Sequence, residues 1–461
     1  MEHFALSDLP YEIVLRVVQA VDERDPSPTF PRGPSDSLLS LSAVNRWFSN
    51  ICRPLIWRSI KYAPLAPGPH PPAYRKSRNL VALNQILQES QQTRPIKVQE
   101  LSIEEVVSFW EDPEEEDDEM EDVLSLIETL IEGGLQVLFL KGISFDRVGA
   151  NKLLDSIATA PRLSALRFNQ VDFAANRTSL DSVPQLSKIR TLQIMHGSSI
   201  LLNLIEKCPS LDSLLLWPSS RRLGVHADVI KSLLPRLRLL SMDSVRDPSS
   251  FRQLGEEFTR LASQRYAEPL PLEELFLEGP MTETDRSSLV SSLTHLPSLR
   301  RLALYQARNP TPTLFNEIHA SRPELKSLTV MAGDCDGAIL WPCALEEYLP
   351  SISQFKSLEF YASDRRTPPS RDQLADLGTI TRSNPGGISQ SALEFQSFGK
   401  LAKACMSLKE AVAIDQDVSE GTTGYFATFE REKGKIRIAQ KMRTANDFLV
   451  SYDRWVRVEE D

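Results

Sequence analysis

The amino-acid sequence predicts an α/β protein in which short helices and strands alternate along a solenoid. The string L-x-x-L-x-L recurs through most of the chain, and segments with apolar residues at helical spacing stand between its copies. A proline often stands two residues before the string, so a residue that ends helices recurs at one fixed phase. One helix and one strand cannot bury a core alone, and we therefore expect the units to stack.

The first 62 residues predict a helical module ahead of the repeats. Pro10 fits the first turn of a helix, where no amide hydrogen bond is lost. The apolar stripe of that helix consists of Ile13, Val14, Val17, Val18 and Val21. A second stripe predicts a helix that begins after an N-cap at Asp36 and ends at Arg53-Pro54. Its members are Leu38, Leu41, Val44, Phe48 and Ile51.

Three blocks follow one another in this region: LPYEI at residues 9–13, VNRWF at 44–48 and PLIWR at 54–58. In this order they resemble the F-box, the three-helix module by which substrate receptors of cullin-RING ubiquitin ligases hold the Skp adaptor. The resemblance implies that the adaptor contacts are Leu9, Pro10, Ile13, Leu41, Val44, Leu55 and Trp57.

Two proline-rich segments interrupt the helical patterns. Residues 22–35 carry four prolines and predict a loop inserted between the first two helices. Residues 63–78 begin with five prolines in ten positions and predict a linker between the helical module and the repeats.

The net charge of -10 comes from one run. Residues 111–122 contain ten acidic residues and no basic one, so the rest of the chain is balanced. A block of like charges repels itself, and we expect it to be a solvated, disordered loop within the repeats. A docking site for a basic partner is the alternative.

The repeats span residues 79–390. Their copies begin at Val98, Leu135, Leu163, Ile189, Leu211, Leu237, Leu272, Leu299, Leu325 and Phe355. Their spacing and pattern resemble leucine-rich repeats, which implies a parallel inner sheet with helices outside. The asparagine that the family often carries after the last apolar position is absent here.

The pattern weakens beyond Tyr361. Residues 365–387 predict a long loop, and Leu393, Phe398, Leu401 and Cys405 predict a helix. A last strand is expected at residues 408–414 and a hairpin at residues 425–438, with its turn at Gly434. We expect residues 391–461 to complete the last repeat and cap the exposed core.

Strand alternation sends the third, fifth and seventh places of each copy to the inner face of the sheet. Aromatic residues, Arg and Met at these places are the types that anchor protein interfaces. The predicted substrate-binding residues are Phe139, Arg167, Met195, Trp217, Phe276, Arg301, Tyr305, Met331 and Tyr361.

Several classes of protein find no support in the sequence. No apolar run approaches the ~20 residues of a membrane helix, and no signal peptide is visible, so we expect a cytoplasmic or nuclear protein without a membrane partner. The five cysteines are scattered, and we expect neither a metal site nor a cofactor. A doubly wound α/β enzyme would need a binding loop, but no such motif is present. The sequence contains no basic stripe, so we expect no nucleic-acid partner.

Together the two resemblances imply a non-catalytic substrate receptor of an SCF-type ubiquitin ligase. Its partners would be the Skp adaptor, through it the cullin-RING subunits, and an unknown protein substrate. A non-degradative interaction scaffold is the alternative, and an enzyme whose site comes from residues distant in sequence is the third class.

Overall fold

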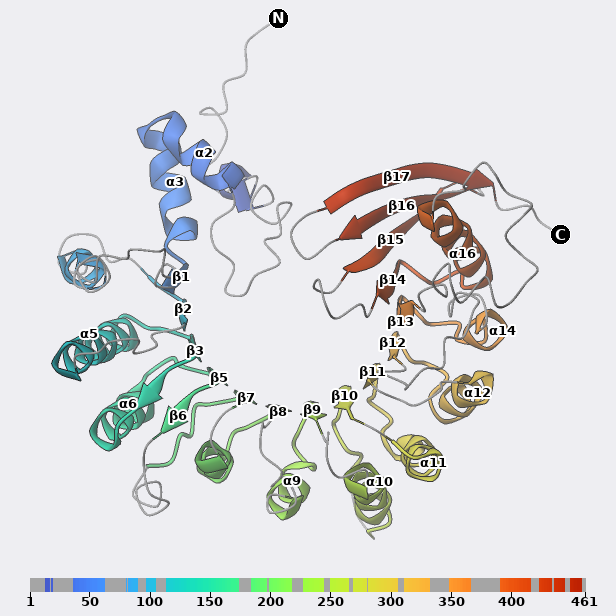
Figure 1. The fold of residues 1–461 in the computed structure, drawn as a ribbon, viewed down its shortest axis with the longest axis horizontal. Coiled ribbons are helices and arrows are strands. Elements are labelled where there is room, and N and C mark those ends of the chain that lie inside the picture. The colour runs from blue at the N-terminus through green and yellow to red at the C-terminus, as the bar shows by residue number, and fades with distance from the viewer. Residues whose placement is uncertain are drawn as a thin grey trace, which may run out of the picture. The chain divides into compact units, whose positions relative to one another are not determined.

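The structure, a computed structural model (Figure 1), divides into two compact units, residues 1–222 (unit 1) and 223–461 (unit 2). The described residues are 13–16, 18–19, 36–62, 80, 82–89, 97–104, 113–173, 184–196, 199–217, 227–243, 249–264, 268–279, 281–305, 311–331, 348–365, 390–415, 423–432, 435–443 and 448–457. The predictions for Leu9, Pro10 and residues 22–35, 63–78 and 366–387 lie outside this description.

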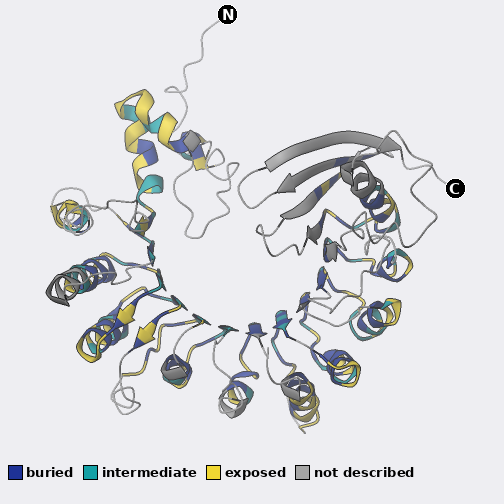
Figure 2. Cartoon of the chain, viewed as in Figure 1, coloured by how far each residue is buried: buried dark blue, intermediate teal, exposed yellow. Residues whose placement is uncertain are grey.

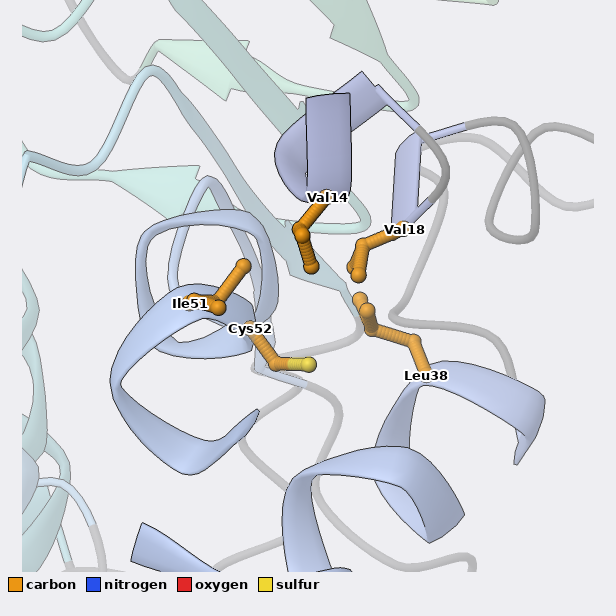
Figure 3. Packing of buried hydrophobic residues seen from close by; sticks show 5 residues of the cluster. All are labelled: Val14, Val18, Leu38, Ile51 and Cys52. Carbon is orange, nitrogen blue, oxygen red and sulfur yellow. The ribbon is translucent and has the colours of Figure 1, made fainter. Parts of the chain in front are cut away.

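Unit 1 begins with the helical module. Residues 13–16 and 18–19 are helical, and helices α2 (Asp36–Val44) and α3 (Arg46–Ile56) follow. Figure 3 shows the core in which these helices meet, formed by Val14, Val18, Leu38, Ile51 and Cys52. Three helical segments therefore share one apolar core, as the sequence predicts.

The second predicted helix is wrong in one respect, because it is broken in two at Asn45. The backbone of Asn45 is extended, and its side chain accepts a hydrogen bond from the Phe48 amide at 3.0 Å, which caps α3. Pro54 lies inside α3 and does not end it, although only Leu55 and Ile56 follow it in the helix. A single apolar stripe runs across the break, so periodicity alone does not detect it.

The strands of unit 1 form a parallel sheet, in the order β1 (Ser59–Tyr62), β2 (Glu100–Glu104), β3 (Val137–Lys141), β5 (Ala165–Asn169), β7 (Thr191–Met195) and β8 (Ser213–Trp217). Helices α5 (Pro113–Glu132) and α6 (Arg147–Thr159), the 3-10 helix η2 (Ser199–Asn203) and α8 (Leu204–Lys207) connect them. Strands β4 (Ser144–Phe145) and β6 (Asp172–Phe173) pair separately. The helices lie along one face of the sheet (Figure 1), and we call the opposite face the open face of unit 1.

Unit 2 repeats the same arrangement. Its parallel strands are β9 (Leu239–Asp243), β10 (Glu274–Glu278), β11 (Arg301–Tyr305), β12 (Ser327–Val330), β13 (Phe360–Arg365) and β14 (Glu410–Asp415). The intervening helices are α9 (Ala227–Leu233), α10 (Ser249–Ala262), α11 (Glu283–Ser292), η4 (Leu293–His295), α12 (Pro312–Ser321), α14 (Leu349–Ile352) and α16 (Gln390–Ala404). The open face of unit 2 is likewise the face of its sheet opposite the helices.

Within each unit, one backbone pattern joins each parallel strand to the next. The carbonyl at the second place of a copy accepts hydrogen bonds from the amides at the second and third places of the following copy, at 2.8 to 3.1 Å. Gln136, for example, accepts from Ser164 and Ala165. The apolar first, fourth and sixth places point to the helices and are largely buried (Figure 2). Nine predicted copies, from Val98 to Leu325, therefore have the predicted register.

The copy predicted at Phe355 is three residues out of register. Glu359, not Lys356, occupies its second place, since the Glu359 amide donates to the Lys326 carbonyl. The copy therefore begins at Leu358, and Tyr361 pairs with core residue Leu328. Tyr361 is accordingly buried in the core and does not lie on the open face.

An additional copy stands at the junction with the helical module. Gln99 and Glu100 donate to the Arg58 carbonyl, which places Trp57, Ile60 and Tyr62 at the apolar places of a copy. The sheet thus begins before the predicted linker at residues 63–78, which falls between β1 and β2. Trp57 belongs to this copy as well as to the end of α3.

The acidic run is not a disordered loop over residues 113–122, because these residues form the first half of α5. Pro113 stands at the first helical position, and negative charge near a helix N-terminus is favoured by the helix dipole. The second half of the helix is anchored by Val123, Leu126, Ile127 and Leu130, all buried. Glu121 also lies 3.6 Å from Lys152 of α6.

The C-terminal predictions are largely confirmed. Helix α16 and strand β14 lie where expected, and β15 (Thr423–Glu432) and β16 (Lys435–Arg443) form the antiparallel hairpin. Strand β17 (Phe448–Arg457), which the sequence did not predict, pairs with β16. Because β15 pairs with β14 in the antiparallel sense, the parallel repeat ends there.

Arg431 of β15 fixes this end of the sheet to α16. Its guanidinium donates to the carbonyls of Ala402 and Cys405, each at 3.0 Å, and to that of Leu408. Cations at a helix C-terminus satisfy its unpaired carbonyls and its dipole. Burial lowers the pKa of Arg431, in keeping with a guanidinium that is partly removed from water.

We expect Arg431→Met to destabilise the C-terminal end of unit 2 by about 2–3 kcal/mol, because it removes charge-assisted bonds to three carbonyls. Amide exchange of β14–β16 in increasing urea measures this loss. The control is Arg238→Met, whose exposed ion pair with Glu273 at 2.7 Å should be worth less than about 1 kcal/mol. Equal losses in the two variants would contradict the role of Arg431.

Candidate functional site: two exposed surfaces of unit 1

The helical module exposes apolar side chains beside its core. Ile13 is 43% exposed and Val44 is 64% exposed, whereas Leu41 and Leu55 pack partly against the core cluster. Leu39, 42% exposed, was not among the predicted contacts, because it lies outside the apolar stripe used to find them. Apolar side chains at this exposure bury only part of their surface on folding and leave the rest accessible.

The open face of unit 1 brings predicted residues together in two cross-strand pairs. Phe139 of β3 is in register with Arg167 of β5, and Met195 of β7 is in register with Trp217 of β8. All four side chains are half-buried. Directly paired residues on neighbouring strands have Cβ atoms about 5 Å apart, so each pair forms a continuous surface.

The charges on this face are mixed. Lys61 and Glu104 form an ion pair at 3.0 Å near the module end of the sheet. Burial lowers the pKa of Arg167, and the electrostatic effect of Glu100 opposes that shift. Aromatic side chains, Met and Arg with mixed charges are typical of a protein-binding surface, and they fit a polyanion less well.

The open face of unit 2 is less accessible at its fifth places. Ser241, Ala303, Thr329, Ala362 and Val412 are small or medium-sized and buried in the folded chain. Phe276 is half-buried between two of them, and Arg301 is exposed and ion-paired with Glu274 at 3.2 Å. The side chain of Tyr305, at the end of β11, is outside the description.

Two of the nine predicted substrate-binding residues are buried, which corrects their predicted placement. Tyr361 is a core residue because its copy begins at Leu358. Met331 occupies the predicted seventh place but is 7% exposed, and its amide donates to the Leu304 carbonyl. Among the predicted residues whose side chains are described, those that are not buried are Phe139, Arg167, Met195 and Trp217 on unit 1 and Phe276 and Arg301 on unit 2.

A second row of backbone hydrogen bonds joins the strands of unit 1 at the carboxyl-terminal edge of its sheet. Gly142, Gln170 and His196 follow the seventh places and adopt positive φ angles of 64, 53 and 50 degrees. Their amides donate to the carbonyls of Asn169, Met195 and Trp217 on the next strand. These bonds hold this edge of the sheet, although two of the three positions lack the glycine that this conformation favours.

Among the described residues, no group of three or more His, Cys, Asp or Glu side chains is arranged to hold a metal ion. Within the same set, no helix has both the length and the apolar character needed to cross a membrane. The buried thiol of Cys405 has its pKa raised to about 11 by burial, so it is protonated and unreactive at neutral pH.

No protein-family model matches the chain, and no curated protein matches it. Among solved structures, a TLR13–ssRNA13 complex is similar, with 15% sequence identity and a TM-score of 0.24 over 60% of this chain. The chain spans about half of that protein, since the match covers 51% of it. The repeat architecture described above follows from the strand register and burial of this chain itself, and it is compatible with a leucine-rich repeat fold.

The strained edge gives a stability prediction. Gln170→Gly should stabilise unit 1 by about 0.5–1 kcal/mol, because glycine adopts a φ of 53 degrees without steric cost and keeps the amide bond. Thr191→Gly, inside β7, is the control and should destabilise by a similar amount. Thermal unfolding measures the stability of both variants. A stabilised control or a destabilised Gln170→Gly would contradict the steric cost assigned to the positive φ angle of Gln170.

Proposed function

We propose that this chain is the substrate-recognition subunit of an SCF-type ubiquitin ligase, acting in the cytoplasm or nucleus. The helical module would bind a Skp adaptor and the open face of unit 1 a protein substrate. The observation that carries the proposal is the exposure of Ile13 and Val44 beside the buried cluster of the module. Exposed apolar side chains of this kind would pack into an apolar groove of the adaptor.

The repeat architecture supports the substrate-binding half of the proposal. A sheet with its helices on one face leaves the other face for a partner, and half-buried aromatic, Met and Arg side chains lie there on unit 1. We propose no catalytic step for this chain, since ubiquitin transfer would belong to the cullin-RING subunits.

A non-degradative interaction scaffold is the alternative, and the same open face would serve it. The two functions differ in the helical module. A scaffold has no need of an adaptor, whereas a receptor must co-purify with Skp adaptor and cullin.

We expect Val44→Asp to abolish co-purification with a Skp adaptor, because it places an unpaired charge in an apolar contact while the exposed site tolerates it in the free protein. Ile13→Asp should act in the same way. The control is Val148→Asp on α6, which is equally apolar and 62% exposed but lies outside the module. Undiminished adaptor recovery by Val44→Asp would reject the docking surface.

We expect Trp217→Ala to weaken substrate capture by about 2 kcal/mol or more, since half-buried aromatic anchors dominate interfaces. Adaptor binding should be unchanged and unfolding only slightly affected. Leu216→Ala removes the adjacent core side chain and should instead cost about 2–5 kcal/mol of stability. Affinity purification of the variants, with circular dichroism on the same samples, separates the two effects; full capture by folded Trp217→Ala would move recognition to another surface.

A further inference from the structure

The last strand of unit 2 leaves one edge of its sheet open. Strand β17 pairs with β16 in the antiparallel sense and ends the strand order among the described residues. Figure 1 shows it as the outer strand of this part of unit 2. Within the part of the chain that is described, the outward backbone amides and carbonyls of β17 therefore have no strand to pair with. Such an edge is a template for pairing with another chain.

The cap of the repeats does not require this strand. The last repeat strand, β14, is covered over its whole length by Thr423–Thr428 of β15. Phe429 of β15 contacts Phe398 of α16, with ring centroids 6.4 Å apart, and Ile436 and Ile438 of β16 are buried. Strand β17 lies beyond β16 and runs for ten residues. The sheet thus extends one long strand past the part that caps the core.

The sequence of β17 does little to block pairing at its edge. The strand contains no proline and no glycine, and its pairing with β16 is regular from Val450 to Arg457. Edge strands that must stay unpaired are usually short, bulged or interrupted by proline. The charges of β17, on Asp453, Arg454 and Arg457, leave pairing open but restrict the register in which a partner strand fits.

We infer that β17 pairs with β17 of a second copy of this chain, so that the two sheets become one. Antiparallel strands related by a two-fold axis make the same contacts in both copies. Because this pairing occupies both free edges, assembly stops at the dimer. The inference goes beyond the proposed ligase role and does not depend on it.

Symmetry restricts the register of such a pair. A two-fold axis perpendicular to the sheet keeps each residue on its own face in both copies, so opposed positions differ by an even number of residues. Two such registers use all of β17 except one end residue: one places Tyr452 opposite itself, and the other places Asp453 opposite itself. Like charges directly opposite each other destabilise a strand pair. The register with Tyr452 on the axis is therefore favoured.

The remaining pairs of this register agree with that choice. Its opposed residues are Phe448 and Val456, Leu449 and Trp455, Val450 and Arg454, and Ser451 and Asp453. Pairs of aromatic with aliphatic residues stabilise neighbouring strands, and no like charges lie opposite each other. The other register would instead place Leu449 opposite Arg457 and Trp455 opposite Ser451.

Size-exclusion chromatography with light scattering tests the dimer on the full-length protein. At micromolar concentration the wild type should have twice the 51.9 kDa mass of the chain. Tyr452→Asp and Tyr452→Lys should each weaken the dimer by at least about tenfold, because each places like charges opposite each other at the axis. A mixture of the two variants should form a dimer again, since an aspartate then lies opposite a lysine. A misfolded variant would not be rescued in this way.

The matched control is Thr428→Lys. Thr428 is exposed and lies in β15 opposite Glu410 of β14, inside the sheet and away from the β17 edge. This variant should remain a dimer. A monomeric wild type, a dimer that survives Tyr452→Asp unchanged, or variants that stay monomeric when mixed would each overturn the inference.

Disulfide cross-linking tests the register. Tyr452→Cys should cross-link two copies under mild oxidation, because opposed residues have Cα atoms ~4.5–5.5 Å apart, within the range of a disulfide. The two thiols of Asp453→Cys would lie diagonally, at ~7–8 Å, and should cross-link more slowly. The wild type, which keeps its own cysteines, is the blank. Faster cross-linking of Asp453→Cys than of Tyr452→Cys would refute the proposed pairing.

Discussion

The architecture depends on one repeated interaction, in which a backbone carbonyl at the second place of each copy accepts two amides from the next. This bond pair fixes the register of each parallel repeat strand to its neighbour within a unit. Since side chains alternate along a strand, a slip of one residue would exchange the core face for the open face. Buried leucines at the first and fourth places and the paired amides thus enforce the same register. The composition of each open face is a consequence of that register, because only the third, fifth and seventh places remain free of the core.

The sequence identified most copies because three buried apolar places leave a pattern that few other structures share. It failed at Phe355, where two frames overlap. The frame of Phe355, Leu358 and Phe360 is more apolar than that of Leu358, Tyr361 and Ser363, yet the second frame is correct. The register of this copy is set by its pairing with strands β12 and β14, which places Glu359 between Lys326 and Lys409. The ion pairs of Glu359 with these lysines, at 3.3 and 2.6 Å, lower its pKa and lie at the second places of the three copies. Local apolarity carries no information about such neighbours.

Other failures have the same origin in competing or distant effects. A run of ten acidic residues predicts disorder, but Pro113, the helix dipole and an apolar stripe further along α5 favour a helix. For the candidate site, alternation correctly placed Phe139, Arg167, Met195 and Trp217 on the open face. Alternation alone did not reveal that Met331, at a seventh place, is buried. The exposed Leu39 was missed because a residue outside an apolar stripe looks like any surface position.

The junction between the helical module and the sheet bears on how a receptor would work. Trp57 ends α3, its amide donating to the carbonyl of Arg53 while the next amide, of Arg58, donates to that of Leu55, and it also occupies the first place of the first copy. Only Trp57 and Arg58 separate α3 from β1, and the Arg58 carbonyl already accepts the amides of Gln99 and Glu100. The proline-rich segment that the sequence suggested as a flexible linker lies after β1 and cannot loosen this junction. A substrate receptor must hold its substrate at a defined distance from the adaptor, and a two-residue connection that is part of both elements limits that distance far more than a long linker would. The same residues that begin the ladder of the sheet therefore join the two surfaces on which the proposed function depends.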